Sequence, residues 1–159
     1  MQHFCPDKGR TSVRDVPAQE PSAGVCLCVC MPGRLGSFAR AESFWKQVLP
    51  ATAGAPEMWR IVDGTAGDVH ALTERAEICI VSADEIDGSV LELLRRIGSL
   101  NPAAGVIVVL HEIHHISRFQ ALEAGADAVL PLMADGRLVN AAITALRRRL
   151  SPPALNPEP

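Results

Sequence analysis

The sequence predicts an α/β protein built on an open, doubly wound parallel sheet. Five short apolar segments alternate with amphipathic segments between residues 25 and 150, joined by short connections. Several of these apolar segments are hydrophobic at nearly every position, as strands are when helices cover both of their faces. Strands that alternate with helices in this way indicate βαβ units and a layer of helices on each side of the sheet.

Five segments are expected to be strands because they are short, apolar and rich in β-branched residues. The second of them alternates through Met58, Arg60 and Val62 and is closed by the turn residues Asp63 and Gly64. The five are VCLCVC (25–30), EMWRIVDG (57–64), EICIVS (77–82), GVIVVL (105–110) and DAVLPL (127–132).

Five helices are expected between and after these strands, at about 35–49, 68–75, 89–100, 113–124 and 135–150. Asp87 is expected to be an N-cap or turn residue for the third, and Gly125 the C′ residue of the fourth. The predicted inward faces are Leu35, Phe38, Ala41, Trp45 and Val48 in the first helix, Val90, Leu91, Leu94 and Ile97 in the third, and Leu138, Ala141, Ala142, Ala145, Leu146 and Leu150 in the fifth.

The ends of the chain differ in composition from residues 25–150. Residues 1–24 are polar and aperiodic and are expected to form a disordered arm, whereas residues 151–159 hold four prolines and are expected to be a tail or an interdomain linker. No apolar run is long enough to cross a bilayer, and the N-terminus lacks the apolar core of a signal peptide. The formal net charge of −3 does not indicate a polyanion-binding protein. We therefore expect a cytoplasmic protein of one domain, residues 25–150.

Three of the five cysteines, Cys26, Cys28 and Cys30, recur at every second position of the first strand. This spacing places all three on one face of the strand, where they cannot easily surround one metal ion. Packing in the core as reduced thiols is the favoured interpretation, and metal or redox chemistry is the alternative.

Three stretches resemble the receiver domains of bacterial response regulators. ALEAGADAVLPL (121–132) is similar to the receiver pattern A-L-x-A-G-A-D-D-Y-L-x-K-P, and GSVLELLRRIGSLNPAAGVIVVL (88–110) to D-G-L-E-L-L-R-R-I-R followed by an N-P loop and V-I-V-L-T. VDGTAGDVHAL (62–72) resembles the turn that follows the second receiver strand. The resemblance covers residues 25–150 and implies a flavodoxin-like (βα)5 sheet with the strand order 2-1-3-4-5.

The resemblance also indicates where phosphoryl-transfer chemistry would lie. Receivers accept the phosphoryl group on an aspartate at the end of the third strand, and two acids after the first strand hold Mg²⁺. A hydroxyl residue ends the fourth strand and a lysine ends the fifth. The metal and the lysine neutralise the charge that develops during transfer. Here the phosphoacceptor position is Ser82, the acid pair Cys30 and Met31, the hydroxyl position Leu110, the lysine position Leu132 and the aromatic switch position Val129.

Every chemical group of the receiver is therefore replaced, which predicts a pseudo-receiver that works without phosphorylation. Asp84, Glu85 and Asp87 lie near the same place, but no second acid pair accompanies them to fix a cation. We expect no catalytic residue, no enzymatic activity and no cofactor.

The spelling HEIHH (111–115) matches the metalloprotease motif H-E-x-x-H through His111, Glu112 and His115. A zinc peptidase needs both histidines on one helix and a third ligand downstream, whereas His111 here follows an apolar strand directly and no histidine follows His115. Peptidase activity is not expected. Metal binding or pH sensing by His111, His114 and His115 stays open as an alternative.

In receivers, the surface made by the fourth helix, the fifth strand and the fifth helix binds partners. The corresponding candidates here are Arg118, Gln120, Glu123, Asp127, Arg137, Asn140 and Arg147. The resemblance thus predicts a regulatory module for bacterial transcription that dimerises or binds another protein, and contacts DNA only through an effector domain outside this sequence. The alternative is a stand-alone protein that binds a partner or small ligand at the edge of the sheet where the strands end.

Overall fold

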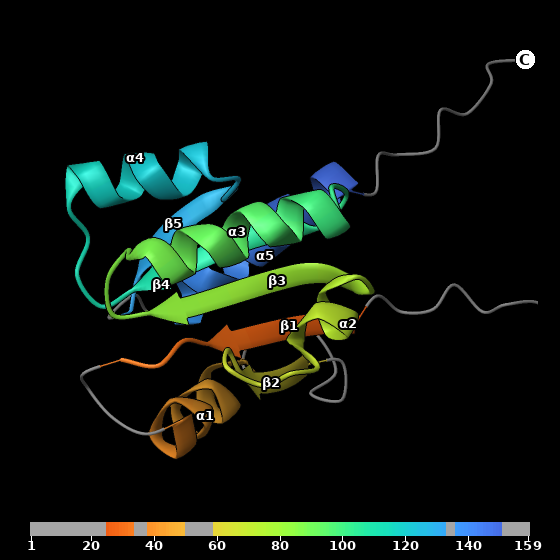
Figure 1. The fold of residues 1–159 in the computed structure, drawn as a ribbon, viewed down its shortest axis with the longest axis horizontal. Helices are drawn as coiled ribbons and strands as arrows, with labels where there is room; N and C mark the ends of the chain where they lie inside the picture. Colours follow the sequence, from red (N-terminus) through yellow and green to blue (C-terminus); the bar gives the residue numbers. More distant parts are fainter. Residues whose placement is uncertain (1–24, 34–37, 50–58, 133–135, 151–159) are drawn as a thin grey trace, which may run out of the picture.

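The computed structural model describes residues 25–33, 38–49, 59–132 and 136–150 (Figure 1). Five parallel strands form one sheet in the order β2-β1-β3-β4-β5, which confirms the predicted topology. They are β1 (Val25–Cys30), β2 (Trp59–Asp63), β3 (Ala76–Ala83), β4 (Gly105–Leu110) and β5 (Ala128–Pro131). The predicted N-terminal arm, the C-terminal tail and Met58 lie outside the described residues.

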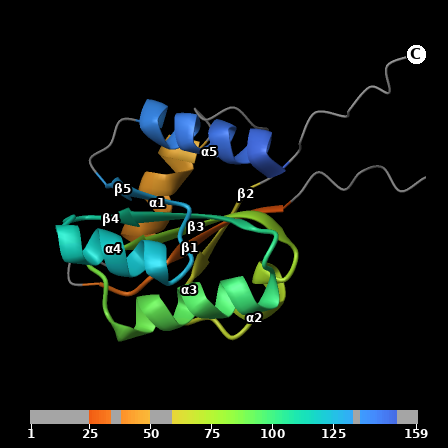
Figure 2. The same cartoon turned by 90° about the horizontal axis from the view of Figure 1, so that it is seen from above.

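Helices cover both faces of the sheet, as the nearly continuous apolar strands require. Viewed along the sheet, α1 (Phe38–Val48) and α5 (Gly136–Leu150) lie on one side, and α2 (Val69–Thr73), α3 (Gly88–Leu100) and α4 (His115–Glu123) on the other (Figure 2). None of the described helices combines the length and the apolar character that crossing a membrane requires.

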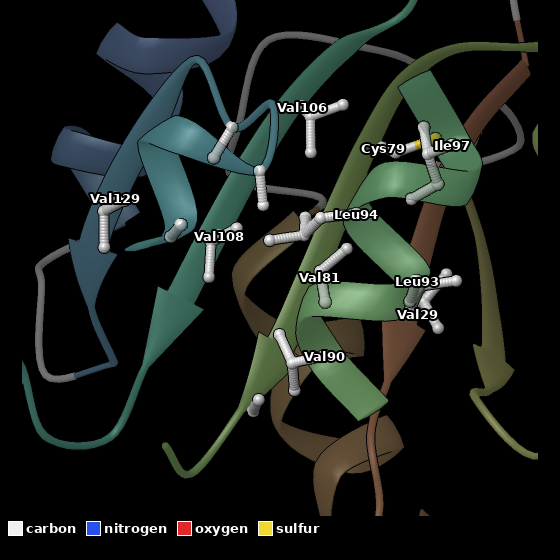
Figure 3. Close-up of a cluster of buried hydrophobic side chains, with 14 of the residues drawn as sticks. Val29, Cys79, Val81, Val90, Leu93, Leu94, Ile97, Val106, Val108 and Val129 are labelled. Atoms are coloured by element: carbon white, nitrogen blue, oxygen red, sulfur yellow. The ribbon is translucent and has the colours of Figure 1, made fainter. Parts of the chain in front are cut away.

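Alternate residues of the strands supply the two halves of the core. On the α3 side, Val90, Leu93, Leu94 and Ile97 face a strand surface that includes Val81 (Figure 3). On the α1 and α5 side, Trp45, Val139, Ile143 and Leu146 pack on strand residues that include Cys26, Cys28 and Cys30. All three thiols are buried on this one face, so the predicted packing of the C-x-C-x-C segment is confirmed.

Two predicted helix ends are confirmed in atomic detail. The Asp87 carboxylate accepts a hydrogen bond of 2.9 Å from the Val90 N–H, so Asp87 caps α3. At the end of α4, Gly125 has φ +115°, and the N–H groups of Gly125 and Ala126 donate to the carbonyls of Leu122 and Ala121. These two bonds form a Schellman motif, which requires the left-handed conformation that glycine adopts without strain.

The predicted inward face of α5 is partly wrong. Leu138 is 46% exposed, and Ala141 and Ala145 are also exposed, whereas Val139 and Ile143 are buried beside Leu146. Three other predictions need smaller corrections: Leu93 joins the buried face of α3, α2 ends at Thr73, and α4 begins at His115 rather than near Ile113.

Candidate functional site

The structure brings most of the residues that the sequence resemblance assigns to receiver active-site positions to one edge of the sheet. Parallel strands end on the same side, and here Cys30 of β1 pairs with Ser82 of β3, which pairs with Val109 beside Leu110. The Met31 N–H donates to the Ser82 carbonyl at 2.8 Å, and the Leu132 N–H donates to the Leu110 carbonyl at 2.7 Å. We call this region, residues 30–33, 82–87, 110–112 and 131–132, the carboxyl edge.

The side chains at these positions offer little phosphoryl-transfer chemistry. Leu110 is fully buried in the core, and Cys30 and Ser82 are 3% and 9% exposed. Val129 lies inside β5, in the core beneath α4, rather than at the edge. Thiol, thioether, hydroxyl and aliphatic groups cannot replace two carboxylates as Mg²⁺ ligands, and Leu132 cannot neutralise a phosphoryl group as a lysine does.

The carboxylates of the carboxyl edge lie in the connections after the strands. Asp87 is committed to the cap of α3, and hydrogen bonds from the Ser89 hydroxyl and the Val90 N–H hold the pKa of its carboxyl below the usual range. Asp84, Glu85, Asp87, His111 and Glu112 line a hollow of about 590 Å³ between the β3–α3 and β4–α4 connections. Within the described part of the chain, no group of three or more His, Cys, Asp or Glu side chains is placed to hold a metal ion.

The histidines are divided between a connection and a helix. His111 follows β4 and its N–H donates to the Ala83 carbonyl at 3.1 Å, while α4 begins only at His115. His111 and His115 therefore do not share the helix that an H-E-x-x-H site requires. His114 lies 3.7 Å from the Glu112 carboxylate at an exposed position, and the buried Nδ1 of His111 has no hydrogen-bond partner.

The four described cysteines differ in acidity because their surroundings differ. Burial raises the pKa of the Cys28 thiol well above its usual value, raises that of Cys26, and raises that of Cys79 to about 12. Cys30 is the exception: a hydrogen bond with the Cys28 thiol lowers the pKa of Cys30. Cys30 is also the cysteine at the carboxyl edge, so the most acidic described thiol lies at a position that the sequence resemblance assigns to a receiver acid.

The α4 residues predicted for the α4–β5–α5 surface are exposed, and two other predicted residues make contacts within the chain. Arg118, Gln120 and Glu123 are exposed on α4. Asp127 instead supports the sheet, because its carboxylate accepts a 2.8 Å hydrogen bond from the Val106 N–H and pairs with Arg149. Nη2 of Arg147 lies 3.7 Å from Sγ of Cys26 in β1.

Two of the three arginines near the end of α5, Arg147 and Arg149, identify two sides of the helix. Residues of an α-helix are about 100° apart, so Arg147 and Arg149 point to opposite sides of α5. Arg149 faces Asp127 beside β5 and Arg147 faces β1. Arg137 and Asn140 fall on the Arg147 side, toward α1, whereas exposed Leu138 falls on the Arg149 side, beside β5.

Sequence reasoning missed an apolar stripe on α4. Ile116, Phe119 and Leu122 recur every three residues and are 73%, 66% and 43% exposed. Ala121 and Ala124, on the opposite side of the same turns, are the residues that face the sheet. The sequence did contain a signal for this stripe. Two alanines on one side of the helix can pack closely on the sheet, which leaves the three large apolar residues on the other side exposed.

Solved structures share this fold at low sequence identity. One from Burkholderia pseudomallei, whose name relates it to pilus assembly, is 15% identical with a TM-score of 0.62, over 80% of this chain and 92% of that one. A second pilus assembly-related protein, from Burkholderia thailandensis, is 17% identical (TM-score 0.56; 77% and 98% covered). A two-component response regulator from Clostridium difficile is 14% identical (TM-score 0.59; 80% and 98% covered).

The fold is thus that of response-regulator receiver domains, as the sequence resemblance predicted. No protein-family model and no curated protein sequence matches the chain. At these identities the likeness concerns the fold alone.

Proposed function

We propose that this chain is an atypical receiver-like regulatory module that acts through protein–protein contacts and does not need phosphorylation. The observation that carries the proposal is the composition of the carboxyl edge. The sheet has the receiver strand order, whereas Cys30, Met31, Ser82, Leu110 and Leu132, which the resemblance assigns to the phosphoryl-transfer positions, include no acid and no lysine. Because such a domain lacks the groups for phosphoryl transfer, it would signal through the surfaces by which it contacts other proteins.

The surface proposed for these contacts is α4–β5–α5, and its occupant is a second copy of the chain. The apolar stripe of Ile116, Phe119 and Leu122 is flanked by Arg118 on one side and Glu123 on the other. Exposed apolar side chains rimmed by charges are typical of protein interfaces. Arg118 and Glu123 are five residues apart, so two parallel copies of α4 would bring the cation of one copy near the anion of the other.

The proposed setting is bacterial transcriptional control in the cytoplasm. Residues 25–150 would form the regulatory domain, and residues 151–159 would link it to an effector domain that contacts DNA.

Phosphorylation independence is tested with acetyl phosphate or beryllofluoride and Mg²⁺. The amide NMR spectrum is expected to remain unchanged, because no acid pair holds the metal at the carboxyl edge. A receiver domain with a complete active site serves as the positive control. Shifts that need both Mg²⁺ and beryllofluoride and that centre on residues 82–87 would refute the proposal.

A second candidate function is a role in pilus assembly, favoured by the names of two of the similar structures. Cells that lack the chain distinguish the two candidates. Loss of surface pili at unchanged pilus-gene transcript levels favours assembly, whereas changed transcript levels favour transcriptional regulation.

A further inference from the structure

A cavity lies between α1 and the ends of β1 and β3. Its volume is about 200 Å³. Most of its wall is apolar, formed by Met31, Ala41, Phe44, Trp45, Ala83 and Leu132. A cavity of about 150 Å³ lined by aliphatic and aromatic side chains accepts benzene in another protein, so this one has room for a ring-sized molecule.

The floor of the cavity carries two adjacent polar groups. Cys30 and Ser82 are register partners on neighbouring strands, so their side chains point to the same face, the one that α1 covers. Ser82 as a residue is 9% exposed, and none of the hydrogen bonds between described residues involves its hydroxyl. The hydroxyl lines the cavity, so it is available to donate a hydrogen bond to an oxygen of an occupant.

The rim of the cavity carries one charge of each sign. Arg40 of α1 is exposed, and no carboxylate of the described residues forms an ion pair with it. Asp84, from the β3–α3 connection, already takes part in another interaction within the chain. The cation is therefore the group left to bind an oppositely charged ligand.

We propose that this cavity binds a small apolar carboxylate with the dimensions of benzoate. The ring occupies the apolar walls, one carboxylate oxygen accepts the Ser82 hydroxyl, and the guanidinium of Arg40 neutralises the anion. Lining of this kind, mostly apolar with a few convergent polar groups, is the usual composition of a small-molecule site. The site lies on the α1 side of the sheet, away from the proposed α4 contacts, and it shares Cys30, Ser82 and Leu132 with the carboxyl edge.

The first experiment is a titration of the full chain with benzoate by isothermal calorimetry and amide NMR. Saturable one-to-one binding is expected, with shifts centred on Cys30, Ser82 and Trp45. Benzyl alcohol, which keeps the ring and one oxygen, is expected to bind at least tenfold more weakly, and benzylammonium more weakly still.

Variants assign the binding to the cavity. Arg40→Gln is expected to weaken benzoate binding at least tenfold while leaving that of benzyl alcohol nearly unchanged. Lys46→Gln is the matched control, because it removes the same charge from the same helix at a residue that does not line the cavity. Ala41→Leu, which extends an apolar side chain into the cavity, is expected to abolish binding of both molecules.

Three results would overturn the proposal. The first is the absence of saturable binding to the folded chain. The second is an equal loss in Arg40→Gln and Lys46→Gln, which would indicate nonspecific attraction to the charge of α1. The third is tighter binding of benzylammonium than of benzoate, which would make Asp84 the controlling charge. None of these results bears on the NMR response to beryllofluoride, so the two proposals fail separately.

Discussion

Truncating Phe119 tests the proposed α4 contact most directly. The side chain is 66% exposed, and an aromatic side chain offers about 200 Å² for burial, so roughly 130 Å² remains available to a partner. If half of that area is buried in the dimer, each copy contributes about 1.6 kcal/mol at ~25 cal/mol per Å². A symmetric dimer contains two copies, so Phe119→Ala is expected to weaken dimerisation by about 3 kcal/mol, or ~200-fold in Kd.

The assay is sedimentation equilibrium at several protein concentrations, combined with urea unfolding at a concentration where the chain is monomeric. Because Phe119 is mostly exposed, the free energy of unfolding of the monomer should change by less than about 0.5 kcal/mol. Leu100→Ala is the control, since Leu100 is also an exposed apolar residue, 40% exposed, but lies at the end of α3. It should leave the dimer unchanged.

Two results would refute the reasoning. A chain that stays monomeric at all accessible concentrations removes the dimer itself. A dimer that tolerates Phe119→Ala but dissociates on charge reversal at Arg137 would place the contact on the side of α5 that faces α1.

The remaining predictions concern single groups. Asp127→Ala should lower the free energy of unfolding by about 1.5–3 kcal/mol, because the Val106 N–H loses a charged acceptor. Arg149→Ala should lower it by less than about 1 kcal/mol, since Arg149 is exposed. Urea unfolding of both variants measures these changes. Asp87→Ala should cost about 1 kcal/mol at neutral pH through loss of the α3 cap. Because the pKa of Asp87 is lowered, its ionised form supplies this stability, so the difference in free energy of unfolding between wild type and variant should shrink as pH falls below about 4. A difference that does not change with pH would contradict the assignment. Iodoacetamide should modify Cys30 before Cys79, whose pKa of about 12 keeps it protonated, as peptide mass mapping can show; faster modification of Cys79 would contradict the assigned acidities.

Local patterns were sufficient to predict the sheet and several helix ends. The strand order followed from the family resemblance, and Asp87 and Gly125 were recognisable because a cap depends on residues within one turn. The division of β1 between two core faces follows from alternation alone.

The inward face of α5 was harder to predict because several of its faces carry small or apolar residues. Leu138 and Val139 are neighbours, and the sequence cannot tell which one faces the sheet until the positions of β4 and β5 are known. The structure selects Val139 and leaves Leu138 exposed beside β5.

The role of Asp127 and the cavity under α1 depend on contacts between distant segments. Asp127 bonds the backbone of Val106, twenty-one residues earlier. The cavity exists because Trp45 and Ala41 of α1 do not fill the space above Cys30 and Ser82. The resemblance assigned Ser82 to the phosphoacceptor position, but its neighbours in sequence could not show that it lines an apolar cavity.

The uncharged groups at the carboxyl edge have a consequence for how such a protein would be controlled. A covalent switch divides a fixed pool of molecules into two states, and the enzymes that add and remove the group set the ratio. With Ser82, Cys30 and Leu132 in place of the reactive groups, occupancy of a partner would follow from mass action alone. The output would then track how much of the chain the cell contains, so synthesis and degradation would act as its on and off signals.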